Sequence, residues 1–175
     1  DPPLDEQINI LLNLKPKIKK MLLIYSFADS SNFIIRQKEE LEKICKNKNI
    51  ELSSVSIYQT NEIYDKSRSF IPNVDAVFIL RDLPIVAGIT GIIKICEKHN
   101  VPLYVSELES VEKGAVIGFG VSQYEIGSRL AGIINNILIN KEKPNKTGYS
   151  LMQDYKIKIN KKHMENQGLE LDKML

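Results

Sequence analysis

Two short polar segments, each directly after an apolar run, carry the residues best suited to hold a charged small molecule. Arg81 and Asp82 follow the apolar residues 76–80. Asp82 suits an ammonium group, and Arg81 suits an anion. The other segment, from Ser26 to Asn32, offers hydroxyls, an amide and a predicted helix N-terminus, which together suit a carboxylate. A zwitterion such as an amino acid would satisfy both segments.

The same residues also have a purely structural interpretation. Asp82 precedes an apolar helical pattern, so its side chain could cap that helix while Arg81 stays in solvent. Ser30, Ser31 and Asn32 precede another predicted helix and are equally good caps. The sequence leaves both interpretations open.

The pattern around these segments predicts a scaffold that brings them together. Apolar runs of strand length alternate with amphipathic helical patterns. The predicted strands cover residues 21–25, 50–57, 76–80 and 101–105, and the helices between them cover residues 33–47, 61–70 and 85–96. This alternation is typical of an α/β fold with a parallel, doubly wound, flavodoxin-like sheet. If the strand order is 2-1-3-4, the two segments flank the switch point where such sheets bind ligands.

After residue 106 the pattern changes, and a strand-helix segment is appended to this sheet. In order, the predicted pieces are an acidic loop (107–113), a strand (115–121), a helix (123–139), a polar linker (140–150), a strand (155–159) and a short helix (161–167).

The sequence contains no residue pattern typical of an enzyme. Gly118 and Gly120 stand between a strand and a helix, but the third glycine of a dinucleotide-binding G-x-G-x-x-G would fall on Gln123. Paired carboxylates on one face, a phosphate-binding lysine loop, a nucleophile elbow and a Cys/His metal pattern are missing. We therefore expect a non-enzymatic protein without a cofactor or a metal.

The cysteines and histidines are expected to be structural or solvated. Cys45 and Cys96 fall on apolar faces of predicted helices, which favours buried free thiols. His99 and His163 lie at predicted helix ends among charged residues, so we expect both in solvent.

Composition argues against nucleic acid as a partner. The 24 basic and 22 acidic residues give a formal net charge of +2 and are mixed along the 175 residues. The basic clusters at residues 15–20 and 156–162 lack interleaved aromatic side chains for base stacking.

No run approaches the ~18 apolar residues of a membrane span. Asp1-Pro2-Pro3 does not resemble a natural start, so we expect a mature or excised piece of a longer chain.

Several short motifs resemble one family of binding proteins. Val111-Glu112-Lys113-Gly114-Ala115, followed by Tyr124-Glu125-Ile126-Gly127 and later by Ile159-Asn160-Lys161-Lys162, is similar to ABC-transporter substrate-binding proteins of the tryptophan/tyrosine type. Residues 25–32 and 74–89 share the resemblance, which covers essentially the whole chain. It implies a type I periplasmic-binding fold, in which two similar α/β lobes close on a ligand.

The resemblance implies a division of the chain and a missing part. Residues 1–106 would be the second α/β lobe, residues 107–150 a crossover segment resembling part of the first lobe, and residues 151–175 the C-terminal strand and helix. Most of the first lobe would be lacking.

The resemblance also implies which residues face the ligand. In the family an acid follows the third strand of this lobe, at the position of Asp82. Ser122 stands where the family has an aspartate, and Gln123 stands at the first of two tyrosines. The ligand-binding candidates are Ser26, Asp29, Ser30, Ser31, Asn32, Arg81, Asp82, Leu83, Glu107 and Ser122. Because Ser122 lacks a carboxylate, one anchor for an ammonium is lost, which leaves a different ligand or weaker binding open.

The function that the resemblance implies is solute binding for an ABC import system. A small molecule such as an amino acid would bind between two lobes, and an ABC permease in the membrane would receive it. The protein would be extracytoplasmic, in the periplasm or lipid-anchored at the bacterial cell surface. Two alternatives remain: a flavodoxin-like signalling or nucleotide-binding domain, although residues 26–32 contain no glycine, and an assembly module that forms a homodimer of the fragment.

Overall fold

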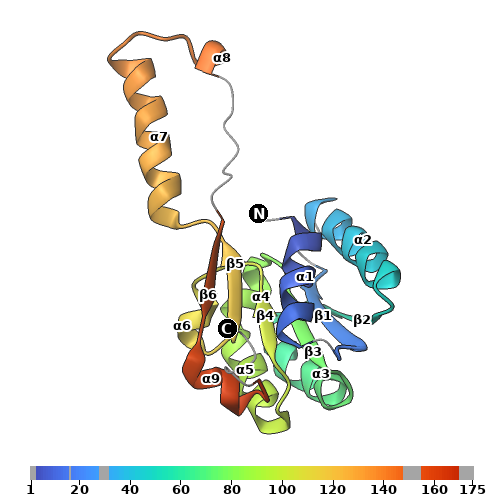
Figure 1. The fold of residues 1–175 in the computed structure, drawn as a ribbon. Helices are drawn as coiled ribbons and strands as arrows, with labels where there is room; N and C mark the ends of the chain where they lie inside the picture. Colours follow the sequence, from blue (N-terminus) through green and yellow to red (C-terminus); the bar gives the residue numbers. More distant parts are fainter. Residues whose placement is uncertain (1–2, 16, 28–31, 148–154, 170–175) are drawn as a thin grey trace.

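Six strands form one sheet in the computed structural model, which describes residues 3–15, 17–27, 32–147 and 155–169 (Figure 1). The strands are β1 (Lys20–Ser26), β2 (Glu51–Ile57), β3 (Ala76–Ile79), β4 (Leu103–Val105), β5 (Ile117–Gly120) and β6 (Lys156–Ile159). They lie in the order β2-β1-β3-β4-β5-β6. β1 to β5 run parallel, and β6 pairs antiparallel with β5. The predicted doubly wound α/β class and the 2-1-3-4 order of the first four strands are confirmed.

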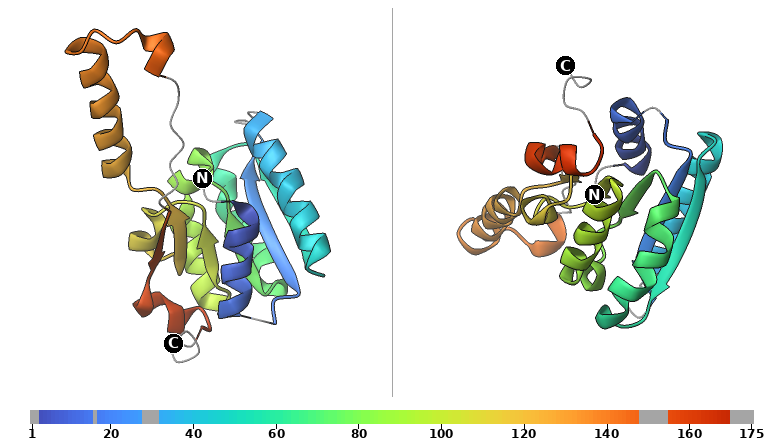
Figure 2. Two further views of the ribbon diagram at one scale, coloured as in Figure 1. Left: turned by 45° about the horizontal axis from the view of Figure 1, so that its top comes forward. Right: turned by 90° about the horizontal axis from the view of Figure 1, so that it is seen from below.

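Helices cover both faces of the sheet (Figure 2). On one face lie α1 (Leu4–Leu14), α2 (Asn32–Asn47) and α9 (Lys161–Asn166). On the other lie α3 (Ile63–Phe70), α4 (Leu83–Ala87), α5 (Ile89–His99) and α6 (Ser110–Lys113). Short 3-10 turns, η1 (Thr60–Glu62) and η2 (Ile71–Asn73), flank α3. Each face buries its own apolar cluster, which is why β1 and β3 are apolar at successive positions instead of alternating.

The apolar pattern after Asp82 predicts one helix, but the chain divides at Gly88 into α4 and α5. A Cβ at Gly88 would lie 2.4 Å from Cδ1 of Ile63, so a larger residue there would require the end of the Ile63 side chain to shift. The acidic segment predicted as a loop at residues 107–113 contains the short helix α6. Both differences depend on contacts between segments that the local pattern does not encode.

The last described segment is fastened to the body by polar contacts. The buried side chain of Gln167 accepts the backbone N–H of Leu103 at 2.8 Å and donates to the carbonyl of Gly114 at 2.9 Å. His163, expected in solvent, instead contacts the carboxylate of Glu97 on α5 through Nδ1 and is partly buried. That expectation was wrong because the register of α9 against α5 was not visible in the sequence.

Both cysteines are buried free thiols, as predicted. Burial raises the pKa of the Cys45 thiol to about 11 and also raises the pKa of Cys96. Neither thiol therefore has the lowered pKa of a reactive cysteine.

One helix stands away from the sheet. α7 (Gln123–Leu138) projects from the end of β5 and is followed by α8 (Pro144–Thr147) (Figure 1). None of the residues of α7 is buried. Its exposed apolar side chains include Tyr124, Leu130, Ile134 and Leu138. Over the described ranges, no helix combines the length and apolar character needed to cross a membrane.

β5 and β6 extend the same sheet as β1 to β4. The division at residues 106 and 150 into lobe, crossover and C-terminal segment stays a prediction.

Candidate functional site

The loop after β3 places Asp82 at the centre of the candidate site, where it is only 2% exposed. Oδ2 accepts the backbone N–H of Ser26 at 2.6 Å, and Oδ1 accepts that of Ile85 at 3.5 Å. Asp82 is therefore the N-cap of α4 and also joins the end of β1 to the loop after β3. The helix-cap interpretation of Asp82 is confirmed, and its contact with a ligand stays a prediction.

The two residues that flank Asp82 have the opposite surroundings. Arg81 and Leu83 are both exposed, and Leu83 is 70% exposed. The sequence thus alternates an accessible cation, a buried carboxylate and an accessible apolar side chain.

The loop after β1 is only partly described. Ser26 is buried, and its backbone N–H is the group that Asp82 holds. Asn32 is the first residue of α2. Asp29, Ser30 and Ser31 lie outside the described residues, so their predicted role stays a prediction. The structure nevertheless brings the ends of β1 and β3 together at the switch point that the strand order predicts.

Glu107 follows β4 and uses its carboxylate inside the protein. It accepts the backbone N–H of Glu109 at 2.6 Å and that of Ser110 at 2.9 Å, which fixes the start of α6. Burial raises the pKa of Glu107, and a hydrogen bond with the Glu109 side chain raises it further. The same bond is the main cause that lowers the pKa of Glu109, and the positive charge of Arg81 lowers it further. Arg81 and the Glu107–Glu109 pair therefore form one charged cluster.

A small recess of about 10 Å³ lies beside this cluster. Its lining consists of Arg81, Ser106, Glu107, Leu108, Glu109, Gly120, Val121 and Gln123. The predicted residues Arg81 and Glu107 thus share a recess with the residues that lead from β5 into α7. The hydroxyl of Ser106 donates to Oε1 of Gln7 at 2.9 Å, which anchors α1 below this recess.

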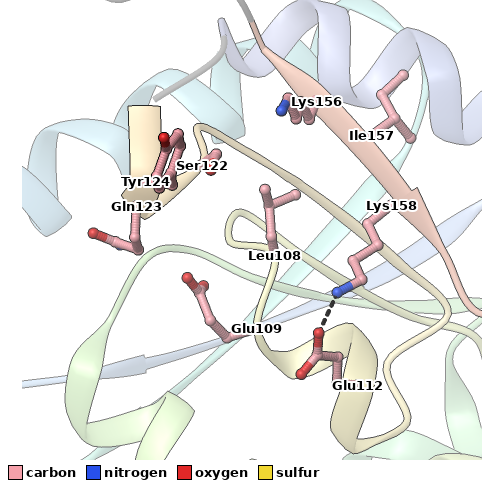
Figure 3. Close-up of a pocket in the computed structure, with 9 residues that line it drawn as sticks. All are labelled: Leu108, Glu109, Glu112, Ser122, Gln123, Tyr124, Lys156, Ile157 and Lys158. Atoms are coloured by element: carbon pink, nitrogen blue, oxygen red, sulfur yellow. Dashed lines mark hydrogen bonds and ion pairs between the residues drawn. The ribbon is translucent and has the colours of Figure 1, made fainter. Parts of the chain in front are cut away.

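A larger pocket of about 430 Å³ opens where the chain passes between the sheet and α7 (Figure 3). It is lined by Leu108, Glu109, Glu112, Ser122, Gln123, Tyr124, Lys156, Ile157 and Lys158. Ser122, one of the predicted residues, belongs to the lining of this pocket. The pocket is crossed by ion pairs from β6: Lys158 contacts Glu112 at 2.5 Å, and Lys156 contacts Glu125 at 2.8 Å.

Sequence reasoning missed Glu109, Lys156 and Lys158 as members of these pockets. The alternation of lysine and isoleucine in residues 156–159 indicated that the two lysines share a face. It did not indicate which strand they lie beside, because no hairpin joins β5 to β6. In the part of the chain that the structure describes, no group of three or more His, Cys, Asp or Glu side chains could hold a metal ion.

Two curated proteins have similar sequences. An uncharacterized protein of Rickettsia prowazekii (strain Madrid E) is 30% identical over 154 residues, which are 88% of this chain and 50% of that protein. A tyrosine-binding protein of Clostridioides difficile (strain R20291) is 24% identical over 138 residues, which are 79% of this chain and 39% of that protein. The chain therefore spans half or less of the length of these relatives.

Solved structures share the fold. A conserved domain protein of Vibrio cholerae matches 96% of this chain and 56% of its own, with a TM-score of 0.86 and 19% identity. A Streptococcus ABC domain in complex with L-Trp matches 97% of this chain and 56% of its own, with a TM-score of 0.84 and 24% identity. The comparisons give no support to a homodimer of this chain.

The sequence model of one family matches the chain from end to end, at residues 1–175. The family resemblance read from the short motifs is thereby confirmed. The chain belongs to the family of ABC transporter substrate binding proteins.

Proposed function

We propose that this chain forms one side of an amino-acid site in the solute-binding component of an ABC import system. The observation that carries the proposal is the junction at the switch point. There, the buried Asp82 carboxylate holds the end of β1, and the exposed Arg81 stands next to it at the edge of the sheet. Ligands of open α/β sheets bind at this position.

The comparisons support an amino acid as the ligand. One similar structure is a complex with L-Trp, and one similar curated protein is a tyrosine-binding protein. Both ligands are zwitterions with a large side chain. The charged cluster at the carboxyl edge offers both signs of charge, which a zwitterion requires and a simple anion or cation does not.

Arg81 and Asp82 bind the two oppositely charged groups of the zwitterion. The Arg81 guanidinium pairs with the ligand carboxylate, because planar guanidinium and carboxylate groups form two parallel hydrogen bonds. The Asp82 carboxylate, which also holds the backbone N–H groups of Ser26 and Ile85, accepts from the ligand ammonium. The backbone N–H of Ser26 keeps that carboxylate in place before the ligand arrives.

A second lobe covers the ligand from the other side. α7 carries exposed apolar residues along its length and has no buried residue, which indicates that another part of the protein packs on it. The relatives and solved structures, about twice the length of this chain, have room for that lobe. Ligand binding holds the two lobes closed, and an extracytoplasmic closed form docks on a membrane permease.

Isothermal titration calorimetry of the full-length protein against the common amino acids tests this function. We expect heat and a saturable isotherm with at least one large amino acid. Arg81→Ala should lower its affinity by about 10- to 100-fold, because a hydrogen bond between two charged groups contributes roughly 1.5–3 kcal/mol.

Arg68→Ala is the matched control, since Arg68 is exposed on α3 and pairs across the helix surface with Asp65 at 3.4 Å. It should leave the affinity unchanged. Binding of none of the amino acids would reject the proposed function, and an unchanged affinity in Arg81→Ala would reject this placement of the site.

A further inference from the structure

Two exposed aromatic side chains stand together at the carboxyl edge of the sheet. Phe27 follows the last residue of β1, and Tyr58 follows the last residue of β2. Their ring centroids are 5.1 Å apart with an interplanar angle of 43°. Even in this contact, Phe27 is 47% exposed and Tyr58 is 54% exposed. Single exposed aromatic residues are ordinary on protein surfaces, whereas two rings in contact form a continuous apolar surface.

Backbone contacts place the ring pair beside Asp82. The N–H of Phe27 donates to the carbonyl of Ile57 at 2.8 Å, so the pairing of β1 with β2 continues to the base of both rings. One residue earlier, Ser26 donates its N–H to Asp82. Consecutive Cα atoms are about 3.8 Å apart and neighbouring strands about 4.8 Å apart. Phe27 therefore follows directly after the residue that Asp82 holds, and Tyr58 lies one strand further along the same edge.

Local contacts hold the Tyr58 ring in its position. The Tyr58 N–H donates to Oε2 of Glu62 at 3.2 Å, and the same carboxylate pairs with Lys66 at 2.9 Å. The Lys66 Nζ lies 5.1 Å from the centroid of the Tyr58 ring, in cation–π range. It also donates to the carbonyl of Ser56 at 3.2 Å. The contacts with Glu62 and Lys66 thus fix both the backbone and the ring of Tyr58. The exposed part of the ring is therefore oriented before any ligand binds.

From these contacts we infer that Phe27 and Tyr58 determine ligand specificity by receiving the side chain of the bound amino acid. The inference rests on the proposed function and adds to it the place where the ligand side chain lies. With the charged ends of the ligand at Arg81 and Asp82, its side chain extends along the edge toward the ring pair. Aromatic rings prefer offset-stacked or edge-to-face contacts with other rings. The site should therefore select aromatic amino acids over aliphatic ones.

The ring pair is tested by the selectivity of the full-length protein. Affinities for tryptophan, tyrosine, phenylalanine and leucine are measured by calorimetry for the wild type, Phe27→Leu and Tyr58→Leu. Leucine keeps an apolar side chain and removes only the ring. We expect each variant to lose about three- to tenfold in affinity for the aromatic amino acids, as aromatic pairs contribute beyond their area. Affinity for leucine should change less than about twofold.

Tyr64→Leu is the matched control, because Tyr64 is a half-exposed tyrosine on α3 that lines a different pocket, with Arg68 and His99. It should leave both affinities unchanged, and circular dichroism should show that all variants are folded. Equal losses for aromatic amino acids and leucine would overturn the inference, because the rings would then act only in lobe closure. Unchanged selectivity would also overturn it. In both cases wild-type binding would leave the proposed function standing, whereas a wild type that binds no amino acid would reject both.

Discussion

The carboxylate of Asp82, after the third strand, accepts the backbone N–H of Ser26, the last residue of the first strand, at 2.6 Å. This contact makes one side chain responsible for both the stability of the switch point and the chemistry proposed for it. The two roles can be separated, because stability is measurable without ligand.

Asp82→Ala should lower the free energy of unfolding by about 2–4 kcal/mol. The change leaves the Ser26 N–H buried without its acceptor, which costs about 1–3 kcal/mol, and it removes the N-cap of α4, which is worth about 1 kcal/mol. Urea denaturation without ligand measures the loss. Asp65→Ala, at an exposed position on α3, should change the free energy of unfolding by less than about 0.5 kcal/mol. Equal losses in the two variants would contradict the structural role of Asp82.

Gln167→Ala should destabilise the protein by about 2–6 kcal/mol. It leaves the N–H of Leu103 and the carbonyl of Gly114 buried without their side-chain partner, at about 1–3 kcal/mol for each group. The exposed neighbour Asn166 provides the control, because Asn166→Ala should be near neutral. Thermal unfolding of both variants compares them, and a Gln167→Ala variant as stable as Asn166→Ala would show that α9 does not fasten the sheet.

The stability of the protein should carry a pH dependence that Glu107→Gln alters. Burial raises the pKa of Glu107 in the folded state above its value in the unfolded chain. Between those two pKa values the folded state binds more protons than the unfolded state. The contribution of Glu107 to the free energy of unfolding is therefore full at pH values below the unfolded-state pKa. It is lost as pH rises through the folded-state pKa. Glu109, whose pKa is lowered, contributes in the opposite sense and loses its contribution as pH falls. Glu107→Gln should therefore lose less stability than the wild type as pH rises through the folded-state pKa of Glu107.

Unfolding free energies at several pH values, each from urea denaturation, measure this difference. Glu112→Gln removes an exposed carboxylate from α6, the helix that follows Glu107, and should leave the pH profile of the wild type nearly intact. A Glu107→Gln profile that runs parallel to the wild-type profile would mean that Glu107 titrates as an exposed acid.

Two glycine-to-alanine changes should have opposite effects. At Gly118 a Cβ would lie 2.2 Å from the carbonyl oxygen of Glu107 and 2.6 Å from Cγ2 of Val111, so the strand and the loop before α6 must separate. We expect Gly118→Ala to cost about 1–3 kcal/mol, as overpacking does. At Gly127, in α7, a Cβ meets nothing within 4 Å. Gly127→Ala should stabilise the 175-residue chain by up to about 1 kcal/mol through helix propensity.

The Gly127→Ala variant also tests whether a second lobe packs on α7. If another lobe packs on α7, the added methyl group should be neutral or destabilising in the full-length protein while it stabilises the 175-residue chain. Circular dichroism and thermal unfolding of both lengths make the comparison. A stabilising effect in both lengths would show that Gly127 faces solvent in the whole protein.

Much of the fold could be predicted because the strands at the centre of the sheet are recognisable from the sequence. Residues 21–25 and 76–80 are apolar without a break, as strands buried on both faces must be, whereas residues 50–57 alternate, which is typical of an edge strand such as β2. The antiparallel partner of β5 could not be found in this way. β6 arrives after α7 and α8, so no turn sequence fixes the pairing or its register.

The candidate site was predicted in part for the same physical reason. The strand order determined that the ends of β1 and β3 meet, and Asp82 lies there as expected. The direction of each side chain depends on tertiary contacts, which the sequence pattern does not contain. The Glu107 side chain, for example, turns inward and holds the start of α6. The place of Ser122 could not be predicted either, because the direction in which α7 leaves the sheet depends on contacts such as that of Glu125 with Lys156.

The pairing of β6 with β5 has a consequence for the order in which this chain folds. β1 to β4 and the helices between them are contiguous in sequence, so they can assemble early, through contacts between segments that are close along the chain. The open edge of β5 must wait for residues 156–159, which are synthesised after α7 and α8. Until they arrive, Ile117 and Phe119 belong to an unpaired strand edge, the kind of surface that recruits other chains. Aggregation of the nascent protein should therefore be governed by how soon this short strand, with its two lysines, reaches its place.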